Sequence, residues 1–422
     1  MKRYAMRRLQ EWKEDPSRLP MIIRGARQVG KTWLMREFGR TAFEKCAYIN
    51  FDRNERMQHL FSGDFDVDRI LQGLSIESEV EIEPENTLII LDEIQEVPAA
   101  LQSLKYFCED ERHSYYILAA GSLLGIAMHE GTSFPVGKVD SMDLHPLSFT
   151  EFLSATGNDP LLLLLQQMDF KMITAFRDKY IDLLRTYYYV GGMPAAVNAY
   201  LPKQSLTAAR RVQIRLISDY EQDFSKHAPA SVISRIRMVW NGIPSQLAKE
   251  NKKFIYSVLR EGARAKDFEL AIQWLIDCGL CYKVGRVTKG GIPLKAYQDL
   301  PAFKLYLVDV GLLAAMTDLD AKTLLRGNAI FTEFKGALTE QYVCQQLVSD
   351  LTAVPYYWSA ESSSGEVDFV LQHGGNVIPL EVKAEENLQA KSLKSFVSGS
   401  GLPFGVRASM SDFRRHERHK IH

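Results

Sequence analysis

A glycine-rich segment near the start of the chain contains the first residues that could do chemistry. These residues fit the pattern G-x-x-x-x-G-K-[ST] and are Gly25, Ala26, Arg27, Gln28, Val29, Gly30, Lys31 and Thr32. In this pattern backbone N–H groups surround phosphate, the lysine reaches the β- and γ-phosphates, and the hydroxyl is a ligand of Mg²⁺. An apolar run precedes the segment and a helix-like stretch follows it. Because the pattern requires this strand–loop–helix context, the segment predicts a site for ATP and Mg²⁺.

Two carboxylates follow another apolar run. The run 88–91 leads directly into Asp92 and Glu93, and the carboxyl ends of parallel strands meet at one sheet edge, beside the phosphate loop. We expect Asp92 to hold Mg²⁺ through water and Glu93 to polarise the water that attacks the γ-phosphate. A further apolar run, 116–120, ends close to Ser122. Its hydroxyl is expected level with Asp92 and within reach of the γ-phosphate, with a simple turn as the alternative.

A second group of charged residues lies near the C-terminus. Glu340 is in a helix-like stretch, Asp368 is in one strand-like segment, and Glu381 and Lys383 are in the next. Residues two apart on a strand share a face, so Glu381 and Lys383 point the same way. If Asp368 faces them, Asp368 and Glu381 supply oxygen ligands for Mg²⁺, Lys383 places an ammonium near a scissile phosphate, and Glu340 completes the shell. An ordinary hairpin with a solvated face is the alternative.

The apolar runs predict the elements that position the first site. Runs at 21–23, 47–51, 88–91 and 116–120 lack polar alternation and are separated by helix-like stretches. This arrangement is typical of a doubly wound parallel sheet covered on both faces, which is an α/β fold. From about residue 158 the pattern turns helical. The three helices and the hairpin expected between 231 and 313 together resemble a winged helix, either near DNA or as a packing module.

Composition limits the classes of protein that the chain could be. Hydrophobic residues make up 46% and charged residues 24% of the 422 residues, which is ordinary for a globular protein of about two to four domains. The 51 Lys and Arg balance 52 Asp and Glu, so a surface for nucleic acid would have to be local. Five scattered cysteines favour a reducing compartment, and no segment approaches a membrane span. We therefore expect a cytoplasmic protein with no membrane partner.

Four motifs together resemble a known group of proteins. The phosphate loop and the segments 88–95, 120–122 and 144–152 look like the AAA-type ATPases of bacteria and archaea, P-loop proteins of the ASCE and STAND kind with a C-terminal domain of unknown function. The resemblance runs over essentially the whole chain. It implies that Pro194, in a Gly-x-Pro lid element, approaches the nucleotide base. Relatives tend to have Gly-Arg where this chain has Gly137 and Lys138, and lysine cannot hold phosphate bidentately, so the role of Lys138 stays open.

The C-terminal residues also resemble a known fold. The order of Asp368, Glu381 and Lys383 is similar to that of PD-(D/E)XK nucleases. The two resemblances imply a P-loop AAA-type ATPase domain (1–157), a helical lid or linker (158–228), a winged-helix-like domain (229–325) and a restriction-endonuclease-like α/β domain (326–422). They imply ATP hydrolysis coupled to binding or cleavage of nucleic acid, with DNA favoured over RNA. The alternative is a nucleotide-dependent switch with an inactive nuclease-like domain, and a protein partner or a second copy of the chain stays open.

Overall fold

The structure is a computed structural model and describes most of the chain. The described residues are 1–112, 114–121, 134–249, 252–326, 332–361, 365–384 and 391–414. Ser122, which was expected beside the γ-phosphate, lies outside these residues. Among the described residues, no helix is both long enough and apolar enough to cross a membrane.

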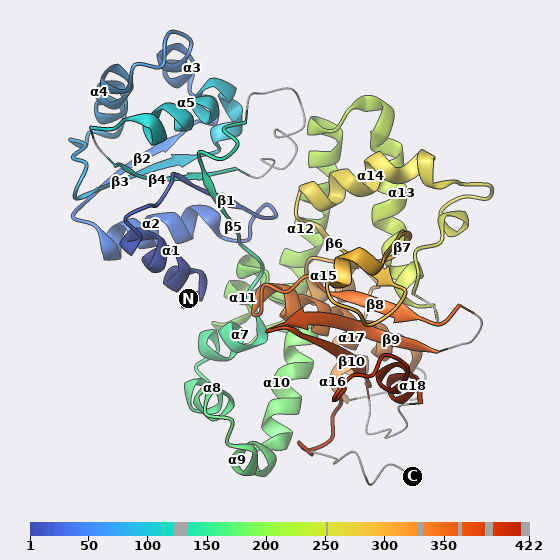
Figure 1. Ribbon diagram of the computed structural model, residues 1–422. Coiled ribbons are helices and arrows are strands. Elements are labelled where there is room, and N and C mark those ends of the chain that lie inside the picture. The colour runs from blue at the N-terminus through green and yellow to red at the C-terminus, as the bar shows by residue number, and fades with distance from the viewer. Residues whose placement is uncertain are drawn as a thin grey trace. The chain divides into compact units, whose positions relative to one another are not determined.

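The chain divides into two compact units, which we describe separately (Figure 1). The N-terminal unit consists of residues 2–145 and 273–280. The C-terminal unit consists of residues 146–272 and 281–422, together with Met1. The phosphate loop belongs to the N-terminal unit, and the expected nuclease-like residues belong to the C-terminal unit.

A five-stranded sheet forms the centre of the N-terminal unit. Its strands are β1 (Met21–Arg24), β2 (Lys45–Asn50), β3 (Thr87–Asp92), β4 (Tyr116–Ala120) and β5 (Asp140–Asp143), in the order β2-β3-β4-β1-β5. Every pairing is parallel. The four strands predicted from the apolar runs are confirmed. Strand β5 was not predicted, because its sequence Asp-Ser-Met-Asp has a single apolar residue, the buried Met142.

Helices cover both faces of this sheet (Figure 1). On one face lie α1 (Ala5–Glu14) and α2 (Lys31–Ala42); on the other lie α3 (Glu55–Phe61), α4 (Val67–Ser78) and α5 (Pro98–Glu109). Helix α4 buries Val67, Ile70 and Leu74, whose spacing of three and four residues places them on one helical face. They pack in one core with the buried Ile49 and Leu91 of the sheet. The prediction of a doubly wound α/β fold is confirmed for this unit.

The C-terminal unit contains a largely helical first part, as predicted. The helices of this first part are α7 (Phe149–Ala155), α8 (Asp159–Gln166), α9 (Phe170–Ala175), α10 (Arg177–Val190), α11 (Pro194–Tyr200), α12 (Leu206–His227) and α13 (Ala230–Leu247). The later helices of the unit are α15 (Val310–Met316), α16 (Ala321–Arg326), α17 (Thr332–Ser349) and α18 (Lys391–Gly399). Helix α14 (Ala265–Asp277) ends within the segment that is grouped with the N-terminal unit.

One mixed sheet runs through the rest of the C-terminal unit. Its strands are β6 (Cys281–Val287), β7 (Gln298–Leu307), β8 (Tyr356–Ser359), β9 (Glu366–His373), β10 (Asn376–Val382) and β11 (Val406–Ala408), in the order β11-β10-β9-β8-β6-β7. The predicted hairpins β6–β7 and β9–β10 are both confirmed as antiparallel. Strand β8 pairs with β6 in parallel and with β9 in antiparallel orientation. The sheet therefore crosses the boundary that was expected between residues 325 and 326.

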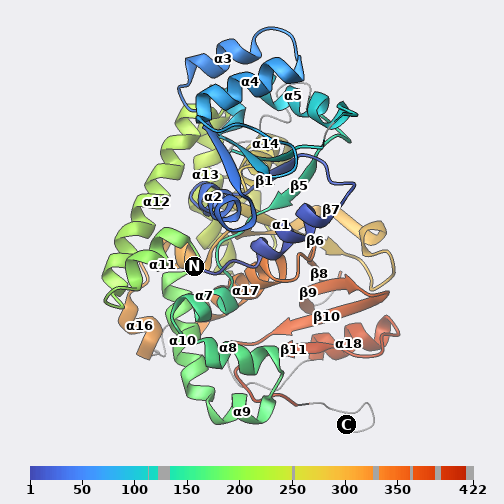
Figure 2. The same ribbon diagram turned by 90° about the vertical axis from the view of Figure 1, so that its left-hand side faces the viewer.

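Helices α17 and α18 cover opposite faces of this sheet. Helix α18 contacts β9 and β10 (Figure 2), and its buried Leu393 and Phe396 pack with Val367 and Val377 of those strands. Helix α17 contacts β7 and β10. Because neighbouring residues of a strand point to opposite faces, Val367 faces α18 while Asp368 faces α17. Because of this alternation, Glu366 and Asp368 of β9 lie on the side of the sheet where Glu340 lies.

Candidate functional site

The phosphate loop connects β1 to α2, and its backbone conformation depends on glycine. Gly25 has φ +141° and Gly30, at the start of α2, has φ +97°. A Cβ atom on Gly25 would lie 2.2 Å from the carbonyl oxygen of Leu144, so no other residue fits there without a shift. Arg3 supports the loop from outside, because its guanidinium donates to the carbonyl of Val29 at 3.1 Å. The strand–loop–helix context predicted for this segment is confirmed.

The side chains of the loop meet the end of β3. The Thr32 hydroxyl donates to Oδ2 of Asp92 at 2.7 Å, and the Tyr48 hydroxyl donates to the same oxygen at 2.9 Å. The Lys31 ammonium donates to the carbonyls of Gly25 and Ala26 at 2.8 and 3.0 Å. The oxygen atoms of Thr32 and Asp92 thus lie side by side, and both are ligands of the kind that Mg²⁺ prefers. A Mg²⁺ ion bound there would be next to the phosphates of ATP, which the Lys31 ammonium also attracts.

Glu93 lies at the same edge of the sheet, one residue beyond β3. It has φ +53°, its backbone N–H donates to Oδ1 of Asp92 at 3.2 Å, and its carboxylate accepts a hydrogen bond from Gln95 at 2.7 Å. Burial lowers the pKa of Lys31, and the charge of Glu93 opposes this lowering. The structure therefore brings Lys31, Thr32, Asp92 and Glu93 together.

The protonation of Lys31 gives the first testable prediction. Burial lowers the pKa of Lys31 to about 8, against the opposing charges of Glu93 and Asp92. The phosphates of ATP favour the charged ammonium, so above pH 8 ATP binding must be accompanied by proton uptake. We expect ATP affinity to fall by up to about tenfold for each pH unit above pH 8. Titration calorimetry in two buffers of different ionisation enthalpy measures the uptake directly, and an affinity that stays constant to pH 9.5 without proton uptake contradicts the prediction.

Two other residues named from the resemblance have local roles in the structure. Pro194 occupies the first turn of α11 in the C-terminal unit, and its approach to the nucleotide base stays a prediction. The preceding Gly192 is enclosed, since its N–H donates to Asp309 at 2.6 Å and a Cβ atom there would lie 2.0 Å from the carbonyl oxygen of Leu147. In the N-terminal unit, Lys138 pairs with Glu109 at 3.0 Å, and nothing in this contact identifies a phosphate clamp.

The charged residues predicted near the C-terminus also converge. Nζ of Lys383 lies 2.7 Å from Oε1 of Glu381, which confirms that these two side chains share a face. The carboxylate of Asp368 accepts a hydrogen bond from the backbone N–H of Val382 at 2.7 Å, so it lies between them along β10. Burial raises the pKa of Asp368, and the charge of Glu340 on α17 raises it further. The hydrogen bond places Asp368 at the end of β10, where the charge of Glu340 also acts on it.

Further charged residues in this cluster were missed from the sequence. Lys252 pairs with Oε1 of Glu340 at 2.6 Å, and Tyr306 donates to Oε2 at 3.2 Å. Lys304 lies 3.7 Å from Oε2 of Glu340 and 2.5 Å from the carboxylate of Glu366. The sequence does contain a signal for Lys304, because it is the single charged residue in the apolar run 302–307 of β7. We call Lys252, Lys304, Glu340, Glu366, Asp368, Glu381 and Lys383 the acidic cluster.

Burial and charge act on the acidic cluster in opposite directions. Burial raises the pKa of Asp368 to about 7, and the charge of Glu340 adds to this effect. Burial also acts to raise the pKa of Glu340, but Lys252 and Lys304 outweigh it and lower that pKa. For Lys304, burial acts to lower the pKa, yet Glu340 and Glu366 raise it. Lys252 and Lys304 therefore keep Glu340 charged, Glu340 and Glu366 keep Lys304 charged, and Asp368 titrates near neutral pH.

Asp368 and Glu381 are the residues of the cluster that best fit a divalent cation. Oε2 of Glu381 is buried and has no hydrogen-bond partner among the residues that the structure describes, and a buried anionic oxygen is costly unless a cation or donor satisfies it. In contrast, both oxygens of Glu340 already have partners. Within the described ranges, no three His, Cys, Asp or Glu side chains form a ready metal-binding group.

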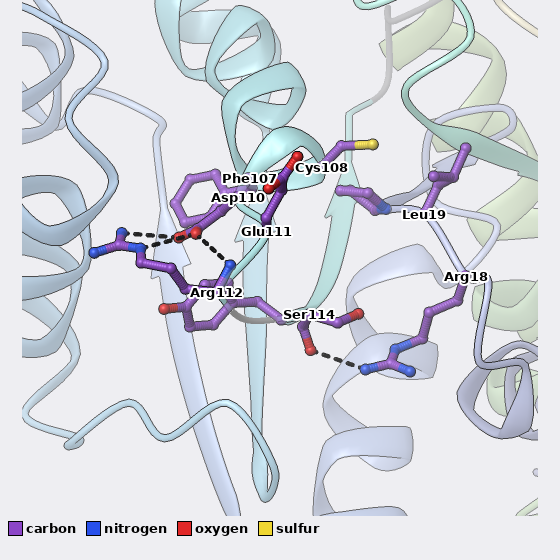
Figure 3. A pocket seen from close by; sticks show the side chains of 10 residues that line it. Arg18, Leu19, Phe107, Cys108, Asp110, Glu111, Arg112 and Ser114 are labelled. Carbon is purple, nitrogen blue, oxygen red and sulfur yellow. Dashed lines mark hydrogen bonds and ion pairs between the residues drawn. The ribbon is translucent and has the colours of Figure 1, made fainter.

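A separate cavity of about 200 Å³ lies in the N-terminal unit (Figure 3). It is lined by residues that precede β1 and β4, which places it at the amino ends of the strands, opposite the phosphate loop. Its arginines are already engaged: Arg112 pairs with Asp68 and Asp110, and Arg18 donates to the carbonyl of Ser114 at 2.8 Å. The cavity is therefore not the nucleotide site.

Comparison with known proteins supports the interpretation of the N-terminal unit. Residues 17–153 match the family model described as AAA domain, which is a class of P-loop ATPases. A similar solved structure is the Walker-type ATPase PABY2304 of Pyrococcus abyssi, with 13% identity, a TM-score of 0.45, and coverage of 74% of this chain and 94% of that chain. Residues 181–323 and 335–421 match two domains of unknown function, DUF8612 and DUF4143. No curated protein matches the chain.

The family matches also bear on the expected domains. The DUF8612 match extends across the boundary expected between residues 228 and 229, and it includes the region compared with a winged helix. The DUF4143 match includes Glu340, Asp368, Glu381 and Lys383. The descriptions of these two families assign no activity, so the winged-helix and nuclease-like interpretations stay predictions.

Proposed function

We propose that this protein hydrolyses ATP with the help of Mg²⁺ and uses the cycle to control the acidic cluster. The observation that supports hydrolysis best is the contact of 2.7 Å between the Thr32 hydroxyl and Asp92 at the carboxyl edge of the sheet, with Lys31 and Glu93 beside it. Thr32 and Asp92 would hold the ion, Lys31 would bind the β- and γ-phosphates, and Glu93 would orient the attacking water. The AAA-domain match over residues 17–153 supports the same assignment.

The second part of the proposal is that the acidic cluster acts on nucleic acid, with DNA favoured over RNA. Asp368 and Glu381 would hold a divalent cation, which when bound polarises a phosphodiester and lowers the pKa of water. Lys383 contacts Glu381 at 2.7 Å, so its ammonium would be close to a phosphate bound to a cation at Glu381. The orphaned, buried Oε2 of Glu381 is the observation that supports this assignment.

Helix α17 contacts the beginning of the C-terminal unit and also contains a residue of the acidic cluster. The segment that follows β5 contacts this helix, since the N–H of Phe149 donates to Gln346 at 2.7 Å and Thr150 donates to Asp350 at 3.2 Å. The same helix contains Glu340. Loops near a γ-phosphate change contacts after hydrolysis, and a rigid helix transmits such a shift. We infer that nucleotide state reaches the acidic cluster through α17.

A second candidate function is a nucleotide-dependent switch whose C-terminal unit binds a partner without cutting it. The observation that favours it is the neutralisation of Glu340 by two lysines, Lys252 and Lys304. A catalytic metal site normally leaves its carboxylates available to the ion. Both candidate functions require the phosphate loop to bind ATP, and they differ only in what the acidic cluster does.

Cleavage of supercoiled DNA tests the proposal and separates the two candidates. The full chain is incubated with Mg²⁺ or Mn²⁺, with and without ATP, beside the variant Lys31→Ala. Nicking that depends on ATP, and that loses this dependence in Lys31→Ala, is the expected result. ATP hydrolysis without any cleavage supports the switch, and the absence of ATP hydrolysis by the wild-type chain refutes the proposal as a whole.

A further inference from the structure

A lysine lies inside the sheet of the C-terminal unit, where charged residues are rare. The side chain of Lys304 on β7 is 0% exposed. Its ammonium lies 2.5 Å from the carboxylate of Glu366 on β9 and 3.7 Å from that of Glu340 on α17. It also lies 4.9 Å from the centre of the Tyr357 ring on β8. The contacts of the Lys304 ammonium therefore join three strands and one helix.

Burial of an ammonium is expensive, so its partners must compensate for the lost hydration. Two carboxylates and an aromatic face do so for Lys304. Lys252 adds a second ammonium, 2.6 Å from Glu340, and is itself nearly buried. The charges of Lys252 and Lys304 thus balance those of Glu340 and Glu366 before any bound ion is counted.

The hydrogen bonds divide the carboxylates into two kinds. Glu340 has partners on both oxygens: Lys252 on Oε1, and Tyr306 and Lys304 on Oε2. Glu381 pairs with Lys383 through Oε1, and its Oε2 is buried with no partner in the described part of the chain. A cation that entered the cluster would find an available oxygen on Glu381 and none on Glu340.

We propose that Lys304 is the internal counter-ion of the acidic cluster, which holds Glu340 and Glu366 and thereby keeps Glu340 out of metal coordination. The cation site is then formed by Asp368 and Glu381 without Glu340, in contrast to the expectation that Glu340 completes the shell. This inference rests on the proposed function in so far as the cluster binds a divalent cation. Lys304 is a positioning residue that limits how tightly the ion is held.

Binding of Mn²⁺ to the nucleotide-free full chain, followed by electron paramagnetic resonance, tests the proposal. All proteins contain Thr32→Val, which removes the oxygen ligand of the phosphate loop. Lys304→Met frees two carboxylates and removes a repelling charge, so we expect Mn²⁺ to bind at least about tenfold more tightly. Lys283→Met is the matched control, because Lys283 lies on the neighbouring strand β6, is exposed, and contacts the Phe303 ring rather than the cluster. It should change the affinity less than about twofold.

Glu340→Gln supplies a second measurement that does not require removal of the buried lysine. Added to Lys304→Met, it should remove the part of the gain in Mn²⁺ affinity that comes from the freed Glu340; alone, it should alter the affinity less than about threefold, because Glu340 is not a ligand. A loss of affinity of tenfold or more in Glu340→Gln alone overturns the proposal, as does an unchanged affinity in a folded Lys304→Met variant. If Lys304→Met lacks a cooperative unfolding transition, Glu340→Gln alone decides.

The failure of the proposed function has a different signature. If Asp368→Asn leaves the Mn²⁺ affinity of the wild-type cluster unchanged, the assignment of Asp368 as a metal ligand fails. A gain of affinity in Lys304→Met that depends on Glu340 still supports the counter-ion role in that case. Absence of Mn²⁺ binding both with and without Lys304 refutes the counter-ion role.

Discussion

Replacement of Glu93 by glutamine is expected to lower the kcat of ATP hydrolysis by about 100- to 1000-fold, with little change in ATP affinity at pH 7. The amide keeps the shape of the side chain and an oxygen that can accept the hydrogen bond from Gln95. It cannot polarise the attacking water, because it has neither the charge nor the basicity of the carboxylate. The change therefore removes an interaction that matters in the transition state and leaves ground-state binding nearly intact.

Steady-state hydrolysis and equilibrium binding of ATP, measured on the same preparations, check this prediction. Glu96→Gln is the matched control, because Glu96 is exposed and lies three residues further along, in the short 3₁₀ helix Ile94–Glu96. A fall in kcat of less than about threefold in Glu93→Gln would show that another group orients the water. The substitution also removes a charge that raises the pKa of Lys31, so ATP affinity should begin to fall at a lower pH than in the wild-type protein.

Local sequence patterns were sufficient to predict most of the nucleotide site. Buried strands are continuous apolar runs, and the phosphate loop has fixed spacing, so β1, β3 and their functional residues could be predicted from neighbouring residues alone. The contact of Tyr48 with Asp92 could not, because it depends on the parallel pairing of β2 with β3 across some forty residues of chain. Arg3 was missed for the same reason, since its partner Val29 belongs to a different element.

The acidic cluster shows a stricter limit on prediction from sequence. The hairpin of β9 and β10 is local, and the alternation of its residues correctly predicted that Glu381 and Lys383 meet. The pairing of β6 with β8 joins segments about seventy residues apart and makes one sheet of two expected domains. Lys304 comes to Glu366 and Glu340 only through that sheet. A charged residue in an apolar strand indicates a buried partner, but the sequence does not identify the partner.

The second large effect is expected from Asp368→Asn, which should lower metal-dependent DNA cleavage by at least about 100-fold. Asparagine keeps an oxygen that can accept the hydrogen bond from the N–H of Val382, so β9 and β10 should stay paired. The lost charge weakens the binding of the cation at Asp368 and Glu381. It also relieves repulsion with Glu340, which raises the pKa of Asp368, so the variant should unfold at the same temperature as wild type or higher.

A loss of DNA cleavage without a lower unfolding temperature distinguishes a catalytic loss from a folding defect. Thermal unfolding and nicking of supercoiled DNA are measured together, with Asp178→Asn as the control for loss of an exposed aspartate in the same unit. Lys383→Met should lower cleavage to a similar extent, because it removes the ammonium beside Glu381, whereas Lys394→Met on the exposed side of α18 should not. If Asp368→Asn and Lys383→Met both cleave at the wild-type rate, any nicking comes from elsewhere, and the C-terminal unit is better explained as a binding module that ATP controls.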